Sequence, residues 1–169
     1  PYGSFGNGAA MRVSPAGFLA KSLEEAWAMS DRVTQVTHNH PEGLKRARAT
    51  VTAIVLARQG ANAEAISNEI AQRFGYDMGR SVDEIRPGYR FDETCQRTVP
   101  EALICALEAE GFEDAVRNAV SLGGDADTLA AIAGAVAEAR FGVPESIASK
   151  TQRLLPAEIL DVLDEMYGG

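Results

Sequence analysis

Three short segments concentrate side chains of the kind used in ligand binding and catalysis. The first is Gly3-Ser4-Phe5-Gly6-Asn7-Gly8-Ala9-Ala10-Met11-Arg12. Its glycines allow the backbone to approach a ligand closely. Successive N–H groups in such a loop, opening onto a helix, favour binding of a phosphate. A Walker loop and a dinucleotide fingerprint are excluded, because no Gly-Lys-Ser/Thr follows and no strand precedes. A flexible N-terminal tail is the alternative interpretation.

The second segment holds both histidines of the chain, in the run Thr37-His38-Asn39-His40-Pro41-Glu42-Gly43. Histidine is a common metal ligand, but zinc sites normally need three or four ligands and no cysteine pattern lies nearby. Two further interpretations stay open. His38 contacts a ligand, or Asn39 or His40 simply forms the turn before Pro41.

The third segment is Ser121-Leu122-Gly123-Gly124-Asp125-Ala126-Asp127-Thr128-Leu129. Two carboxylates and one hydroxyl within a single helical turn offer hard oxygen ligands that suit Mg²⁺, Ca²⁺ or Mn²⁺. Neither an EF-hand nor an aspartyl phosphotransfer pattern fits the run. Alternatively, Asp125 caps the helix and Asp127 complements its dipole without any metal.

The elements that must position these segments are predicted to be helices. Apolar residues recur at spacings of three and four over residues 17–35, 41–59, 62–74, 100–110, 112–121, 125–141 and 156–166. The stretch 41–59 is apolar on nearly two faces, so we expect it at the centre of the bundle. Residues 78–96 read as a long loop with one turn around 82–85, and loops of that length are often functional. The prediction is a single all-α domain over residues 1–169.

Composition narrows the function classes further. The chain of 169 residues is 46% hydrophobic, which is enough for one core. Acidic residues outnumber basic ones 24 to 16, giving a net charge of −8, which argues against nucleic acid as a partner. No apolar run approaches the ~20 residues of a membrane span, so no membrane association is expected. Neither a secretory signal nor a redox spacing of Cys95 and Cys105 is present, so we expect a cytoplasmic location.

The three segments, in this order, resemble the ADP-ribosylglycohydrolase family, which is related to the dinitrogenase reductase–activating glycohydrolase. The likeness continues in Asp83-Glu84-Ile85-Arg86-Pro87-Gly88-Tyr89-Arg90-Phe91-Asp92 and in Thr98-Val99-Pro100-Glu101-Ala102. The resemblance implies an all-α fold around two divalent cations, Mg²⁺ or Mn²⁺, in a cleft that receives ADP-ribose. The metal ligands that it implies are Asp125, Asp127 and Thr128.

The resemblance also implies the substrate contacts. The loop 4–11 is similar to the one that wraps the phosphates and the ribose, which assigns substrate binding to Ser4, Phe5, Gly6, Asn7, Gly8, Ala9 and Met11. His38 is similar to the histidine on the ribose or phosphate side. Tyr89 and Phe91 are expected to wall the cleft or to stack on adenine.

One part of the family pattern has no counterpart in this sequence. The family carries an N-terminal acidic residue and a Thr-Asp-Asp-Thr motif, which complete the metal site and supply the general base. The chain therefore resembles the C-terminal two-thirds of the pattern, and we expect a homo-oligomer or a complementing N-terminal chain. The expected function is metal-dependent hydrolysis of the bond linking ADP-ribose to a protein side chain or small molecule. A non-catalytic ADP-ribose-binding module, a fragment of the hydrolase and a structural protein are the alternatives.

Overall fold

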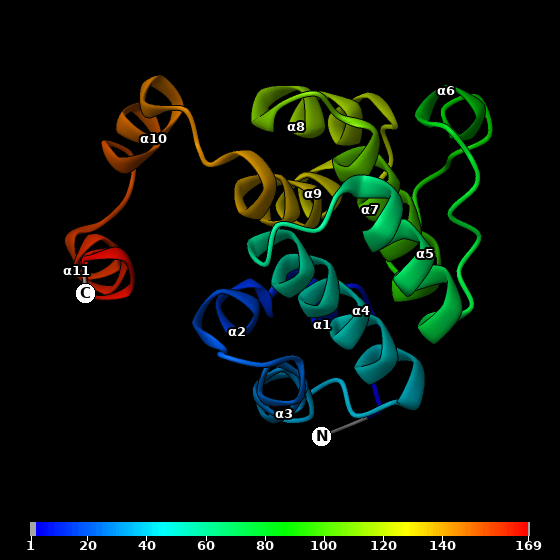
Figure 1. Cartoon of the computed structure of the whole chain (residues 1–169), viewed down its shortest axis with the longest axis horizontal. Coiled ribbons are helices and arrows are strands. Elements are labelled where there is room, and N and C mark those ends of the chain that lie inside the picture. Colours follow the sequence, from blue (N-terminus) through cyan, green and yellow to red (C-terminus); the bar gives the residue numbers. More distant parts are fainter. Residues whose placement is uncertain (1–2, 169) are drawn as a thin grey trace.

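The computed structural model describes residues 3–168, and the regular elements in that range are all helices (Figure 1). They are α1 (Gly8–Met11), α2 (Ser14–Leu19), α3 (Leu23–Thr34), α4 (Pro41–Arg58), α5 (Ala63–Phe74), α6 (Val82–Ile85), α7 (Cys95–Glu108), α8 (Phe112–Ser121), α9 (Ala126–Phe141), α10 (Glu145–Gln152) and α11 (Ala157–Tyr167). The only extended pairing among the described residues is an isolated bridge between Gly6 and Thr94. The predicted all-α class is confirmed.

Helix α4 lies at the centre of the bundle, as its apolar pattern predicts. Its side chains are buried on several faces, including Val51, Ala53 and Ile54. Helices α2, α3, α5, α7 and α9 all pack against it. The approach of α2 is very close, because a Cβ at Gly17 would lie 2.8 Å from the Ile54 side chain. A second group of contacts joins α7, α8 and α9. Because α7 and α9 also pack against α4, the two groups of helices share one core.

The prediction of one helix over residues 17–35 is wrong. The chain breaks between α2 and α3, where Ala20 takes an extended conformation. Ser22 caps α3 by accepting from the Glu25 N–H at 3.1 Å, and the Glu25 carboxylate accepts from the Lys21 N–H at 2.8 Å. This reciprocal pair starts a new helix inside a continuous apolar period, and the Arg58 guanidinium donates to the Ala20 carbonyl at 3.1 Å.

Three other features differ from the prediction. Helix α7 begins at Cys95 and carries Pro100 in its interior, whereas the sequence places its start at that proline. The earlier start is anchored because the Cys95 N–H donates to the Phe5 carbonyl at 3.1 Å and the Thr98 hydroxyl donates to the Thr94 carbonyl at 2.8 Å. The short helices α1 and α10 are additional elements. The turn predicted around residues 82–85 is confirmed as α6.

Local signals place α5 well. Asn62 caps it by accepting from the Ala65 N–H at 2.8 Å, and Gly75 ends it in the left-handed conformation at φ 69°. The starts and ends of α4, α8, α9 and α11 also lie within about one residue of the prediction.

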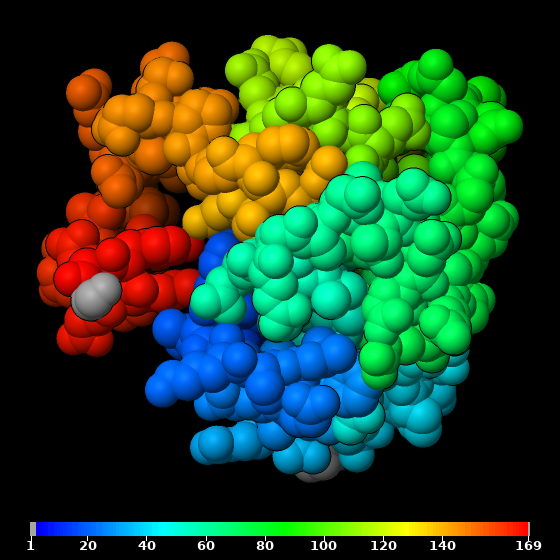
Figure 2. Space-filling view, viewed as in Figure 1, coloured from blue at the N-terminus to red at the C-terminus, as the bar shows by residue number. Residues whose placement is uncertain are grey.

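Helices α10 and α11 form an arm at the C-terminal end. Neither helix has a buried residue, and Figure 2 shows the arm, in orange and red, as a lobe beside the compact body. The Tyr167 hydroxyl donates to the Glu138 carboxylate at 2.6 Å and so ties α11 to α9. Across residues 3–168, no helix has both the length and the apolar character needed to cross a bilayer.

Candidate functional site

The glycine-rich segment forms one wall of an open cavity of about 690 Å³. The opposite side is made by His38, which precedes α4, and by the end of the loop that leads into α7. The lining residues are Gly3, Ser4, Phe5, Gly6, Asn7, Gly8, His38, Glu93 and Thr94. Segments that are far apart in the sequence therefore meet at this cavity.

Backbone hydrogen bonds fix the glycine-rich segment against the body. The Asn7 N–H donates to the Glu93 carbonyl at 2.8 Å, and the Gly3 N–H donates to the Asn39 side chain at 2.8 Å. The Ser4 hydroxyl oxygen accepts from the Gly6 N–H at 3.2 Å, which tightens the turn. The interpretation of this segment as a flexible tail is therefore wrong for the described residues.

The cavity depends on two glycines that face His38. A Cβ at Gly6 or Gly8 would lie 3.5 or 3.4 Å from the His38 Nε2 atom. Any side chain larger than a methyl group at either position would occupy the space in front of the imidazole. The absence of side chains keeps this part of the cavity open.

The His38 side chain is only 8% exposed, and its burial favours the neutral imidazole. Burial lowers the pKa of His38, and the positive charge of Arg12 lowers it further. The Nδ1 atom shares a hydrogen bond of 2.7 Å with the Thr37 hydroxyl, which also accepts from the Arg12 guanidinium at 3.0 Å. A neutral imidazole with an oriented ring suits a hydrogen bond to an uncharged hydroxyl.

The acidic segment begins α9, but Asp125 does not cap that helix. Its side chain makes no capping hydrogen bond, so the structural alternative for this residue is wrong. The Asn7 side-chain amide instead donates to the Asp125 carboxylate and lies 3.3 Å from the Thr98 hydroxyl. The glycine-rich segment and the acidic segment thus make direct contact.

The other two predicted metal ligands lie beside Asp125. Asp127 is exposed, and its carboxylate accepts from the Thr128 N–H at 2.8 Å. A hydrogen bond with the Asp125 side chain lowers the pKa of Asp127, and the Thr128 N–H lowers it further. The Thr128 hydroxyl lies 3.7 Å from the Met11 sulfur, which is a second contact with the glycine-rich segment.

These side chains fit one side of the coordination shell of a hard cation. Two neighbouring carboxylates and a hydroxyl are the oxygen donors that Mg²⁺ and Mn²⁺ prefer. Within residues 3–168, no group of three or more His, Cys, Asp or Glu side chains is arranged to hold a metal. The remaining ligands of such a cation must come from outside the described residues, from the substrate or from water.

Tyr89 lies behind the acidic segment. A Cβ at Gly124 would lie 2.9 Å from its ring and 3.2 Å from the backbone of Phe91, so this loop packs tightly against the turn before α9. Burial raises the pKa of Tyr89 to about 12, with a further contribution from the charge of Glu101. The Phe91 side chain is 67% exposed. The role of these rings as a cleft wall or adenine platform stays a prediction.

Some predicted residues lie away from the cavity, and others were missed. Ala9 is completely buried in the core, and Met11 contacts Thr128. Glu93 and Thr94 line the cavity, and the length of their loop is the one sequence feature that points to them. The Cys95 thiol donates to the Gly6 carbonyl at 3.0 Å, and burial raises its pKa to about 11, so it supports the loop as a neutral thiol.

Comparison with known sequences covers nearly the whole chain. The profile of the ADP-ribosylglycohydrolase family matches residues 1–168. A protein of Pseudomonas putida (strain GB-1) named ADP-ribosylarginine hydrolase Tri1 is 32% identical over 149 residues, which are 82% of this chain and 39% of the relative. Human ADP-ribosylhydrolase ARH3 is 27% identical over 194 residues, covering 85% of this chain and 53% of the relative. The chain therefore spans between two fifths and about half of these relatives.

Proposed function

The chain belongs to the ADP-ribosylglycohydrolase family, and from this premise we propose that it forms the ADP-ribose-binding part of a metal-dependent hydrolase. The reaction is hydrolysis of the glycosidic bond that links ADP-ribose to a protein side chain or a small molecule. Relatives bearing the names ADP-ribosylarginine hydrolase and ADP-ribosylhydrolase support this reaction class.

The contact between Asn7 and Asp125 is the observation that carries the proposal. Asn7 lines the cavity and also donates to the first predicted metal ligand. A ligand in the cavity would consequently lie next to the oxygen donors at the start of α9. Hydrolysis at a sugar carbon needs this proximity, because substrate and activated water must be held together.

Each side chain has a distinct part in this proposal. The cavity lined by the glycine-rich segment receives the diphosphate without requiring a basic surface. Neutral His38 hydrogen-bonds a ribose hydroxyl, and Asn7 orients the Asp125 carboxylate. Asp125, Asp127 and Thr128 would hold a divalent cation. When bound, that cation supplies a Lewis acid that orients the ribose hydroxyls and polarises water.

The complete site requires groups beyond these three ligands. Mg²⁺ prefers six oxygen ligands, so further carboxylates and the general base are proposed to come from a complementing N-terminal segment or chain. The cytoplasmic location and the homo-oligomer stay predictions.

A non-catalytic ADP-ribose-binding module is the second candidate function. The observation in its favour is the limited donor set, since the described residues hold no cluster of three or more metal-binding side chains. The binding module would use the same cavity as the hydrolase and would differ from it only in not hydrolysing the bound substrate.

Calorimetric titration with ADP-ribose, in the presence and absence of Mn²⁺, tests the proposal. We expect binding that Mn²⁺ strengthens, with release of ADP-ribose from a mono-ADP-ribosylated protein once the remaining ligands are supplied. Binding without release under those conditions would favour the non-catalytic module. Failure to bind ADP-ribose would remove both candidates.

A further inference from the structure

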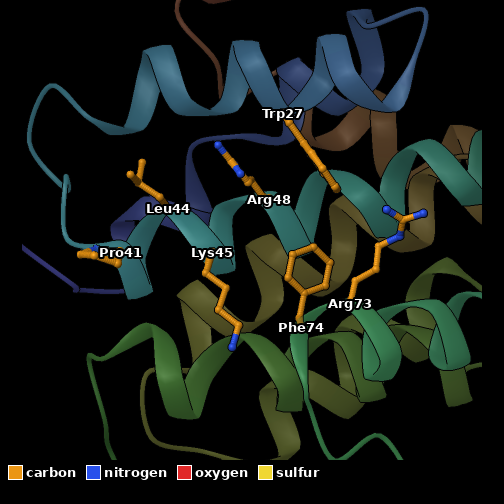
Figure 3. A pocket seen from close by; sticks show the side chains of 7 residues that line it. All are labelled: Trp27, Pro41, Leu44, Lys45, Arg48, Arg73 and Phe74. Atoms are coloured by element: carbon orange, nitrogen blue, oxygen red, sulfur yellow. The ribbon is translucent and has the colours of Figure 1, made fainter.

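A second cavity, of about 560 Å³, lies between α3, α4 and α5. In a chain with a net charge of −8, its lining contains three cations and no acidic side chain. The lining residues are Trp27, Pro41, Leu44, Lys45, Arg48, Arg73 and Phe74, which we call the cationic groove. Figure 3 shows Lys45 and Arg73 on opposite sides of the Phe74 ring, with Trp27 extending toward it from α3.

The floor of the cationic groove is rigid. The Trp27 indole N–H donates to the Thr52 hydroxyl at 2.9 Å, which fixes the ring. The guanidinium carbons of Arg48 and Arg73 lie 5.6 and 5.7 Å from the centre of the Trp27 ring system. Such stacking holds both cations against an aromatic surface.

The cations keep capacity for an anionic partner. Arg48 is paired with Asp31 through two of its nitrogens, and Arg73 is paired with Glu69 through its Nε atom. Lys45 contacts the Tyr76 ring at 5.7 Å and has no ion pair among the described residues. Two of the three cations are thus already ion-paired, and Lys45 supplies the uncompensated positive charge above the apolar floor.

Helix α11 offers the complementary surface. Leu163 and Tyr167 line the space between the arm and the body. By helical periodicity, Glu158, Asp161, Val162 and Glu165 share the opposite face, which we call the acidic face. Val162 is 58% exposed, and the flanking Ile159 is 46% exposed. This face thus combines three carboxylates with the exposed aliphatic side chain of Val162.

We propose that the acidic face of α11 docks into the cationic groove of a second copy of this chain. The carboxylates would meet Lys45 and the remaining donors of Arg48 and Arg73, and Val162 would cover the aromatic floor, as when an amphipathic helix binds a groove. A chain cannot fill its own groove, because α11 lies at one end of the long axis of the molecule, apart from the helices α3, α4 and α5 that line the groove (Figure 1). The contact joins two different surfaces, so it closes either reciprocally in a dimer or in a longer head-to-tail assembly. The proposal is independent of the hydrolase activity.

Sedimentation velocity on the full chain at low salt tests the proposal through charge reversal. One variant carries Asp161→Lys with Glu165→Lys, and a second carries Lys45→Glu with Arg73→Glu. Each variant alone should weaken self-association at least about tenfold, and raising the salt concentration should weaken that of the native chain. A control with Glu110→Lys and Glu113→Lys near α8 has the same change in net charge as the α11 variant and should associate like the native chain.

Mixing the two reversed variants gives the decisive result. The reversed helix of one then meets the reversed groove of the other, so association should return. Circular dichroism establishes that each variant folds, and recovery in the mixture would itself exclude misfolding as the cause of the loss. A native chain that stays a single 18.0 kDa species at all concentrations would overturn the proposal. Persistent association of either variant, or a mixture that fails to recover, would overturn it as well.

Discussion

Helices α4 and α9 both begin beside the cavity, but they use the polar residue at that position in opposite ways. The His40 Nδ1 atom accepts from the Glu42 N–H at 3.1 Å and so caps α4. Asp125 holds the equivalent position at α9, and its side chain makes no capping hydrogen bond there. Its carboxylate instead receives the Asn7 side chain from the glycine-rich segment.

The difference separates a side chain that caps its own helix from one that contacts a distant segment. A capping side chain stabilises a helix by about 1 kcal/mol, and α9 gives up that contribution at Asp125. The carboxylate is instead held by Asn7, a residue of the cavity lining. At these two helix starts, the His40 side chain hydrogen-bonds to its own helix, whereas the Asp125 side chain hydrogen-bonds to Asn7 in a distant segment.

The largest effect is expected from Asp127→Ala, which removes one of the predicted metal ligands at the start of α9. We expect Mn²⁺ to stabilise the native chain and to give the variant no stabilisation at all, because one of two neighbouring carboxylates is removed. The helical content should stay unchanged, since Asp127 is exposed. Thermal melting with and without Mn²⁺ measures the effect, and Asp114→Ala in the first turn of α8 is the matched control. An equal Mn²⁺-induced shift in Asp127→Ala would place the metal elsewhere.

A smaller loss is expected from filling the cavity with Gly8→Val. The new side chain would enter the space within 3.4 Å of the His38 Nε2 atom. We expect ADP-ribose affinity to fall about tenfold or more, which corresponds to ~1.4 kcal/mol or more. Calorimetry measures it against Gly111→Ala, where a Cβ meets no atom within 4 Å. Unchanged affinity would remove this space from the ligand site.

His40→Ala should affect stability without comparable loss of binding. Removing the cap of α4 is expected to cost ~1 kcal/mol in the free energy of unfolding, measured by urea denaturation. ADP-ribose affinity should change far less than in Gly8→Val, because His40 contributes to the site only through its edge contact with Phe5. A large loss of ADP-ribose affinity with unchanged stability would show that His40 serves ligand binding and not the capping of α4.

The smallest effect concerns pH. The folded pKa of His38 lies below its ordinary value of 6.5, so the unfolded chain takes up this proton first as the pH falls. The corresponding stability is present above pH 6.5 and is lost as the pH falls through the folded pKa. Urea denaturation between about pH 7.5 and 5.5 should show a weaker pH dependence in His38→Gln than in the native chain. An equal slope would mean that His38 titrates normally.

The sequence predicts helix starts and ends correctly where they depend on residues that are adjacent in the chain. The cap at Asn62 and the left-handed Gly75 are local signals, and both are confirmed. The break before Ser22 lies inside a continuous apolar period, so periodicity alone hides it. Glu93 lines the cavity because of its place on a loop tied to Asn7 by backbone hydrogen bonds, and no side-chain pattern marks such a position. The metal-ligand roles at α9 stay a prediction. The contact of Asp125 with Asn7 could be found only from the folded structure, because the two residues are 118 positions apart in the sequence.

The most direct test of a shared site is Mn²⁺ titration monitored by the ¹H–¹⁵N spectrum of the chain. Paramagnetic broadening reports which amides lie near the ion. If the two segments form one site, the signals of residues 6–8 and 123–128 should broaden together at low Mn²⁺, and Asp127→Ala should abolish both effects. Broadening confined to one segment, or concentrated on the exposed acids of α11, would contradict the account.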